Sequence, residues 1–273
     1  MDMDVVVPAH NEEFGITACL DRLAGSTQVN RVVVVANGCG DRTAELARAH
    51  FSAPIVIEVE QPGKAGALNA GDAVCVEFPR AYVDADIELD GADLDALAVA
   101  AGEPGVEAAI PSARLDLSRS SWLVRRYYAV WQRLPAVHSS SAGRGVYVLG
   151  RDAHDRVFPL PPDLISDDGH VSRLVPDRAV VDGATVTVTA PRDLRSLVRR
   201  RQRVHSGNTR IQQSSAAGAG LATVLGLVRT RQAYLLDVAV FVGVTLLARV
   251  LVSARRGEVG WGTDHSSRTA VRA

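Results

Sequence analysis

Two aspartates separated by one residue, Asp84 and Asp86, have the residue type and the spacing to hold a divalent cation. In extended chain, side chains two residues apart point the same way, so both carboxylates can address one ion. Mg²⁺ and Mn²⁺ favour oxygen ligands, usually one or two carboxylates plus substrate phosphate oxygens. Such a cation neutralises the charge that develops on a diphosphate leaving group. A turn with two solvated acids is the alternative, and Glu88 and Asp90 continue the spacing, so the ligands within this run stay open.

A glycine-rich segment with one lysine, residues 63–71, is expected to join a strand to a helix. Lys64 and the glycines at a helix start can contact phosphate. The segment lacks the spacing of a P-loop, which argues against hydrolysis of a nucleoside triphosphate. The alternative is that this segment is only the start of a helix and that Lys64 is a surface lysine without a ligand.

An adjacent acidic pair, Asp167 and Asp168, is the third cluster. Adjacent carboxylates repel each other, which raises one pKa and can prepare a general base. An N-cap pair for a helix that starts near His170 is an equally good interpretation.

A dense cationic stretch, residues 199–205, contains four arginines and one histidine. Arginine suits bidentate binding of phosphate. A solvated helix face, or contact with anionic lipid headgroups, competes with that interpretation. The net charge of −1 and the scarcity of aromatic residues in this stretch argue against nucleic acid as a partner.

The elements that must position these clusters alternate along the first half of the chain. Short apolar strands are expected at residues 5–7, 32–35, 55–59 and 81–83, with helices between them. Continuous apolar strands that alternate with helices indicate an α/β fold with a mostly parallel sheet covered on both faces. Polar clusters at residues 10–13, 37–41 and 84–86 follow three of these strands, at the edge where such sheets bind ligands.

The second half predicts an aromatic, arginine-rich helix at 120–134, strands at 146–149 and 180–189, and a basic helix at 192–210. Residues 214–220 resemble a linker. The segment 234–252 is almost wholly apolar and approaches the ~20 residues that span a bilayer. Asp237 and Arg249 interrupt it, so a membrane-spanning helix and a buried or interfacial helix both stay open.

The chain of 273 residues has room for one large α/β domain and an appendage. We expect the domain to cover 1–213, and a linker, an apolar helix and a polar tail to cover 214–273. Three cysteines without CxxC spacing indicate a reducing compartment. We therefore expect the catalytic domain to be cytosolic, at the cytoplasmic face of a membrane.

The order of these motifs resembles glycosyltransferase family 2, over roughly residues 5–208. The resemblance rests on six segments in sequence, namely 7–13, 36–43, 63–71, 84–86, 167–168 and 200–203. It implies a GT-A fold, a Mg²⁺ or Mn²⁺ cofactor, a nucleotide-sugar donor and inverting transfer to an acceptor hydroxyl.

The resemblance also implies a role for each candidate residue. Asp168 is implied as the catalytic base, Asp86 as the metal ligand and Asp84 as a ligand shared with the ribose of the donor. The remaining residues implied to bind the nucleotide-sugar are Pro8, Ala9, Glu12, Glu13, Asn37, Lys64, Arg200 and Arg203.

Two departures from the family pattern narrow the function. Asn37 stands where many members carry an aspartate, which leaves the nucleotide open. Val204-His205 stands where processive synthases carry a tryptophan, which favours transfer of a single sugar. The apolar segment 234–252 motivates the hypothesis that the acceptor is lipid-linked or part of the cell envelope. A nucleotidyltransferase on a similar scaffold, and a non-catalytic nucleotide-sugar-binding membrane protein, are the alternatives.

Overall fold

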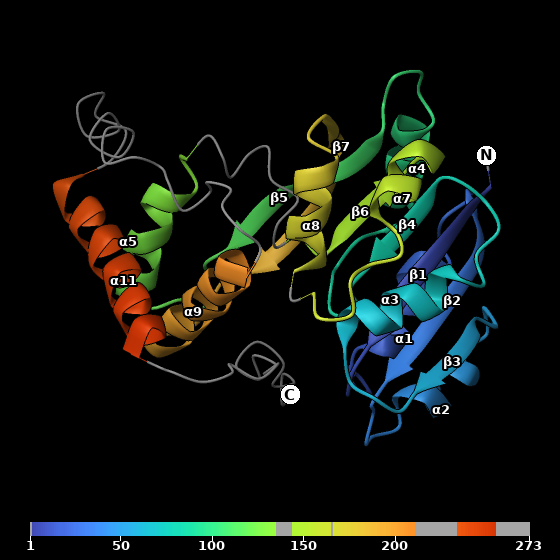
Figure 1. Ribbon diagram of the computed structural model, residues 1–273, viewed down its shortest axis with the longest axis horizontal. Helices are drawn as coiled ribbons and strands as arrows, with labels where there is room; N and C mark the ends of the chain where they lie inside the picture. Colours follow the sequence, from blue (N-terminus) through green and yellow to red (C-terminus); the bar gives the residue numbers. More distant parts are fainter. Residues whose placement is uncertain (1, 135–143, 165, 211–233, 255–273) are drawn as a thin grey trace. The chain divides into compact units, whose positions relative to one another are not determined.

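The computed structural model describes residues 2–134, 144–164, 166–210 and 234–254, and the side chains of 203–210 lie outside this description. The chain divides into two compact units, which are treated separately below (Figure 1). The first comprises Met1–Arg114 and Ser141–Val188, and the second comprises Leu115–Ser140 and Thr189–Ala273. The domain boundary expected after residue 213, and most of the loop before the strand at 146–149, lie outside the described residues.

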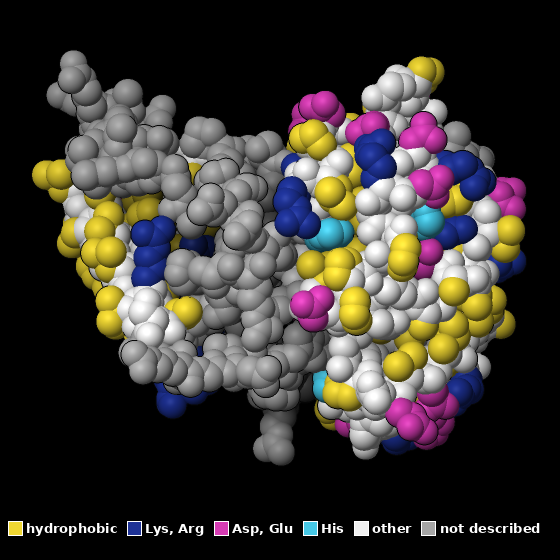
Figure 2. Space-filling model, viewed as in Figure 1, with side chains coloured by type: hydrophobic (Ala, Val, Ile, Leu, Met, Phe, Trp, Pro, Cys, Tyr) yellow, Lys and Arg dark blue, Asp and Glu magenta, His cyan; other side chains and the backbone are white. Residues whose placement is uncertain are grey.

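In the part of the second unit that the structure describes there are three helices, α5 (Trp122–Trp131), α9 (Leu194–Arg210) and α11 (Leu235–Ala254). Their shared core contains Tyr127 from α5, Leu197 from α9 and Phe241 from α11, and the rings of Tyr127 and Phe241 stack 5.0 Å apart. Within the described residues, α11 is the one helix long and apolar enough to cross a membrane. Hydrophobic side chains lie along its outer side, at the left of Figure 2.

The first unit is organised around a seven-stranded sheet in the order β3-β2-β1-β4-β6-β5-β7. The pairs of β1 with β2, β1 with β4 and β2 with β3 are parallel, and β6 pairs antiparallel with β4 and β5. The strands are β1 (Met3–Ala9), β2 (Val29–Asn37), β3 (Ile55–Val59), β4 (Arg80–Val83), β5 (Ala108–Asp116), β6 (Val146–Leu149) and β7 (Arg178–Thr189). The mostly parallel α/β sheet predicted from the apolar strands is confirmed.

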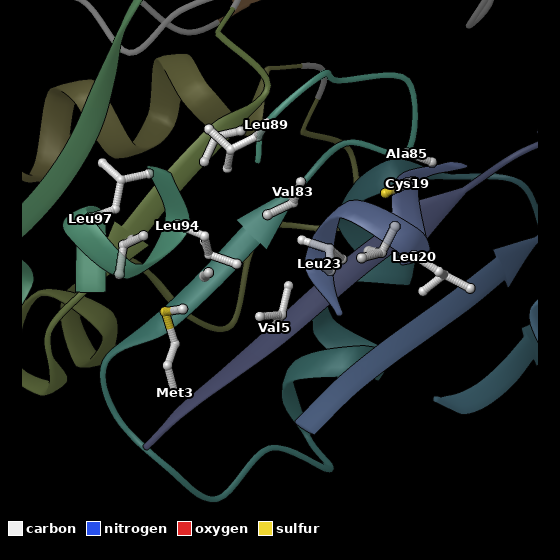
Figure 3. Close-up of a cluster of buried hydrophobic side chains, with 14 of the residues drawn as sticks. Met3, Val5, Cys19, Leu20, Leu23, Val83, Ala85, Leu89, Leu94 and Leu97 are labelled. Carbon is white, nitrogen blue, oxygen red and sulfur yellow. The ribbon is translucent and has the colours of Figure 1, made fainter. Parts of the chain in front are cut away.

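The sheet is buried on both faces because alternate residues of its central strands enter two different cores. Val5 and Val7 of β1 pack against Leu20 on one face, whereas Val6 packs against Leu68 on the other. Figure 3 shows the first of these cores, to which Leu20 and Leu23 contribute from one helix and Leu94 and Leu97 from another. The helices of the first unit are α1 (Ile16–Leu23), α2 (Thr43–Arg48), α3 (Lys64–Asp72), α4 (Gly91–Ala101), α7 (Arg151–Val157) and α8 (Asp167–Leu174).

A buried polar cluster joins the end of α3 to the start of β4. Asp72 accepts hydrogen bonds from Arg80 Nη1 at 2.8 Å and from the Tyr82 hydroxyl at 2.7 Å. His154 of α7 places Nε2 3.0 Å from Asp72 Oδ2 and Nδ1 3.0 Å from Asp155 Oδ1. Burial lowers the pKa of His154, but the hydrogen bonds to Asp72 and Asp155 outweigh it and hold the pKa above its ordinary value. The cluster fixes α3 against β4 at the edge of the sheet opposite the polar loops.

His154 should make the stability of the first unit depend on pH. Because its pKa is raised in the folded state, the stabilisation is complete below the unfolded value of about 6.5 and is lost as the pH rises through the folded value. We expect His154→Gln to lower the free energy of unfolding more at about pH 5.5 than at about pH 8.5. Urea unfolding monitored by hydrogen exchange of the β1 and β4 amides measures this difference. An equal loss at both pH values would contradict the assignment.

Candidate active site

Lys64 joins two acidic segments at the carboxyl edge of the parallel strands. It is the first residue of α3, and its Nζ lies 2.7 Å from Asp84 Oδ1 and 2.9 Å from Asp167 Oδ1. The Asp167 side chain is only 7% exposed, and those of Lys64 and Asp84 are 21% and 31% exposed. Three segments that are distant in the sequence therefore meet at one ammonium group.

The charges at this point are unbalanced in favour of the acids. Burial lowers the pKa of Lys64, but Asp167, Asp84 and Asp168 outweigh it and hold the pKa above its ordinary value, so the ammonium stays charged. Burial raises the pKa of Asp84 to about 7, with Asp167 and Asp86 adding to the rise and Lys64 opposing it. Two carboxyl groups contact the ammonium of Lys64, Asp168 also acts on its charge, and Asp86 acts on Asp84. The acids therefore outnumber the cation, and such an environment attracts further positive charge.

Asp84 and Asp86 lie in a turn directly after β4. The N–H of Asp84 donates to Gly145 O at 2.8 Å, and the N–H of Ile87 donates to Asp84 O at 3.1 Å. Gly145 has φ of +68°, and a Cβ there would lie 2.5 Å from Ile87 Cγ1 and 3.2 Å from Asp84 Oδ2, so only glycine fits. Asp84 is half-buried in this turn, whereas Asp86 is exposed.

The second acidic cluster begins α8. Ser166 is the N-cap residue, and its Oγ accepts from Gly169 N at 3.2 Å. The Ser166 hydroxyl and Gly169 N both donate to Asp168 Oδ1, at 2.5 and 2.7 Å, which fixes the orientation of the half-buried carboxylate. The helix starts at Asp167, three residues before the start expected near His170, and the capping role belongs to Ser166.

Asp167 and Tyr147 are members of the site that the sequence interpretation did not assign to it. The Tyr147 hydroxyl on β6 donates to Asp167 Oδ2 at 3.3 Å, while Asp167 Oδ1 faces Lys64. Burial raises the pKa of Tyr147 well above its ordinary value, so the phenol stays protonated and remains a donor. In the sequence, the adjacent acids Asp167 and Asp168 already indicated a possible role for Asp167. Tyr147 lies in an apolar strand, and nothing in the sequence there indicated a site residue.

The loops after β1 and β2 are tied to each other beside this site. Glu12 N donates to Thr43 Oγ1 at 2.8 Å, and Glu13 N donates to Asp41 Oδ2 at 3.1 Å. The buried Glu12 carboxylate lies close to Gly15, as does the carbonyl of Ala85: a Cβ at Gly15 would be 3.7 Å from Glu12 Oε2 and 3.8 Å from Ala85 O. The loop of Glu12 therefore borders the acidic turn.

Pro8, Ala9 and Asn37 occupy the last residues of their strands. Pro8 pairs with Val35, and Ala9 pairs with Ala36, so these segments end side by side. Asn37 is 1% exposed, and its Oδ1 accepts from Gly63 N at 3.0 Å. The amide of Asn37 thus holds the chain immediately before Lys64, in addition to its predicted place near the nucleoside.

The two arginines predicted to contact the donor belong to the second unit. Arg200 and Arg203 lie on α9, and Arg200 Nη1 donates to Thr189 O at 3.4 Å within that unit. Their contact with the donor stays a prediction.

The acidic turn fits a metal that is bound together with its substrate. Among the described residues, no three His, Cys, Asp or Glu side chains are grouped so that they could hold a metal ion by themselves. Two carboxylates completed by phosphate oxygens and water are, however, the usual environment of Mg²⁺ at a nucleotide. Asp84 and Asp86 provide such a pair, and Lys64 supplies a second positive charge beside it.

Comparison with known proteins agrees with this geometry. Residues 4–138 match the family described as Glycosyl transferase family 2. No curated protein sequence matches the chain at a significant level.

Two solved structures with the same fold contain nucleotide-sugars. A mannosyltransferase from Pyrobaculum calidifontis in complex with GDP-Man and Mn²⁺ has 20% identity and a TM-score of 0.61, covering 94% of this chain and 76% of the other. Glucosyl-3-phosphoglycerate synthase from Mycobacterium tuberculosis in complex with Mn²⁺, UDP-Glc and phosphoglyceric acid has 23% identity and a TM-score of 0.56, covering 79% and 81%. At these identities the likeness establishes the GT-A fold.

Removal of the positive charge of Lys64 should destabilise the first unit. We expect Lys64→Met to cost about 2–4 kcal/mol, because the buried carboxylate of Asp167 loses its counter-charge. The double variant Lys64→Met/Asp167→Asn should cost less than the two single variants together, with a coupling energy of about 1–3 kcal/mol. Urea unfolding of the unchanged protein, the two single variants and the double variant gives the coupling energy as a double-mutant cycle.

Arg42→Met is the matched control, because it breaks the exposed pair with Glu45 and should change the stability little. Additive effects of the Lys64 and Asp167 substitutions would show that the two residues are not coupled.

Proposed function

We propose that the chain transfers a single sugar from a nucleotide-sugar to an acceptor hydroxyl with inversion at the anomeric carbon, because residues 4–138 match glycosyltransferase family 2. The observation that carries the proposal is the position of Lys64 between Asp84 and Asp167. It places the acidic turn, a cationic side chain and the acid pair of α8 within one site at the carboxyl edge of the sheet.

The donor is proposed to lie over the ends of β1 and β2. Pro8, Ala9, Glu12 and Glu13 border this region, and Asn37 supports it through Gly63. The GDP-Man complex of the mannosyltransferase and the UDP-Glc complex of the synthase support a nucleotide-sugar as the ligand of this fold.

A Mg²⁺ or Mn²⁺ ion is proposed to be held by Asp86, with the diphosphate of the donor completing its coordination. When bound, the ion stabilises the negative charge that develops on the departing nucleoside diphosphate. Lys64 adds a fixed positive charge on the same side, and it holds Asp84 in place beside the ribose. Both effects favour cleavage of the bond between the anomeric carbon and the phosphate oxygen.

Asp168 is proposed as the catalytic base. The acceptor oxygen forms a bond to the anomeric carbon, the bond to the diphosphate breaks on the opposite side, and the acceptor proton passes to Asp168. The hydrogen bonds from Ser166 Oγ and Gly169 N orient the carboxylate for this transfer. Asp167, held by Lys64 and Tyr147, positions the start of α8 and with it Asp168.

The acceptor is proposed to be lipid-linked or part of the cell envelope, with the reaction taking place at the cytoplasmic face of the membrane. The apolar helix α11 supports membrane proximity. Equal activity of the full chain on soluble and on vesicle-embedded acceptors would remove this part of the proposal.

Two substitutions separate the metal role from the base role. We expect Asp86→Ala to abolish Mn²⁺-dependent binding of the donor, measured by thermal shift with GDP- and UDP-sugars. We expect Asp168→Asn to bind the donor normally but to lose roughly 10²–10⁴-fold in turnover, because the base is absent.

Asp163→Asn, an exposed acid shortly before α8, is the control and should retain both properties. Retained turnover in Asp168→Asn would refute the base assignment. Release of pyrophosphate from a triphosphate substrate would instead identify a nucleotidyltransferase.

A further inference from the structure

The outward face of α11 is mainly apolar, with Ser253 near its C-terminal end as an exposed polar residue. Leu236 is 50% exposed, Leu246 53%, Leu247 44% and Val250 63%. Successive members are 10, 1 and 3 residues apart, and at about 100° per residue all four lie on one side of the helix. None of the side chains exposed on this face carries a charge. A stripe of this length on the surface of a folded protein marks an interaction site.

The inward face of the same helix carries the polar group. Asp237 is 3% exposed, and its Oδ1 accepts from Arg126 Nη1 of α5 at 3.1 Å. Phe241, Val244 and Ala248 are buried against α5 and α9. The helix is thus more polar where it contacts protein and more apolar where it is exposed, the reverse of a helix that faces water.

The packing of α11 argues against a helix that crosses the bilayer. Its 20 residues would reach about 30 Å, which is enough to span by length. To place its whole circumference in hydrocarbon, however, the helix would have to leave its core and break the buried pair of Asp237 with Arg126. Its neighbour α9 carries too many arginines to enter the hydrocarbon with it.

Between α9 and α11 lies an open groove of about 490 Å³. Leu194 and Val198 form one wall, and Leu247 and Leu251 form the other. Arg195 and Arg199, four residues apart and both exposed, also line it. An apolar groove lined in part by two guanidinium groups matches the chemistry of an acyl chain that ends in a phosphate headgroup.

We infer that the second unit binds the surface of an anionic bilayer, with α11 lying in the plane of the membrane. The leucine face enters the interface to the depth of the headgroup and acyl boundary. Arg195 and Arg199 contact lipid phosphates, and an acyl chain occupies the groove. The inference concerns the second unit alone and does not depend on glycosyl transfer.

Flotation of the full-length protein with vesicles tests the surface. We expect binding to vesicles of phosphatidylglycerol and phosphatidylcholine. Leu246→Glu/Val250→Glu should lower the partition coefficient by at least about tenfold. Arg195→Gln/Arg199→Gln should lower binding to the anionic vesicles about 10- to 30-fold and leave the weaker binding to pure phosphatidylcholine unchanged.

Phe51→Glu/Val76→Glu is the matched control, because both side chains are exposed hydrophobics of the first unit. It should bind as the unchanged protein does. Circular dichroism and thermal unfolding confirm that each variant is folded. Unchanged flotation of folded Leu246→Glu/Val250→Glu overturns the inference. A concentration-dependent dimer that this substitution dissociates, with no vesicle binding, assigns the face to a second copy of the chain and also overturns it.

Spin labels distinguish a helix in the membrane plane from one that spans. Labels at Leu236→Cys, Gly243→Cys and Val250→Cys, in a Cys39→Ser background, report depth through their accessibility to oxygen and to a nickel chelate. Cys19 and Cys75 are buried, and a Cβ at Gly243 meets no neighbour within 4 Å. Equal, shallow depths at all three positions support the inference. A deep central label with two shallow ends would establish a span and overturn it.

Discussion

The ammonium of Lys64 is the interaction on which the rest of the site depends. Without it, Asp84 and Asp167 would bring two carboxylates together at a partly buried point, at a large electrostatic cost. Each of these three residues begins or follows a different element, namely α3, β4 and α8. The three side chains therefore meet only when the sheet, α3 and α8 are all in their final places. Formation of the site thus depends on completed folding of the first unit.

The architecture of the first unit could be predicted because its central strands are buried on both faces. Residues 5–7 and 32–35 are continuous valine runs, a pattern that few structures other than a covered parallel strand produce. The position of the acidic turn followed from the same reasoning, since parallel strands end at one edge. The strand β5 and the helix α4 gave no comparable signal in the sequence. The apolar residues of α4, mainly alanine and leucine, occur on all sides of the helix, and β5 contains a proline.

The contacts within the site could not be predicted, because they join residues far apart in sequence. Asp168 was predicted as the base from its motif, and that role stays a prediction. The contact of its neighbour Asp167 with Lys64 depends on where α8 packs against the sheet. Asn37 was expected to face the nucleoside, yet its amide also secures Gly63. The orientation of α11 was similarly ambiguous, because hydropathy measures how apolar a segment is and not which of its faces is covered.

The ion pairs at the two ends of α3 have a geometric consequence. From Lys64 to Asp72 the helix rises about 12 Å, and from Arg80 to Asp84 the extended chain advances about 13 Å. The two lengths are nearly equal, so Lys64 meets Asp84 at one end of the helix while Asp72 meets Arg80 at the other. A residue inserted in α3 would rotate one end by about 100° relative to the other. The length of α3 is thus constrained by charge as well as by packing, since a Cβ at Gly71 would lie 2.5 Å from Val6 Cγ1.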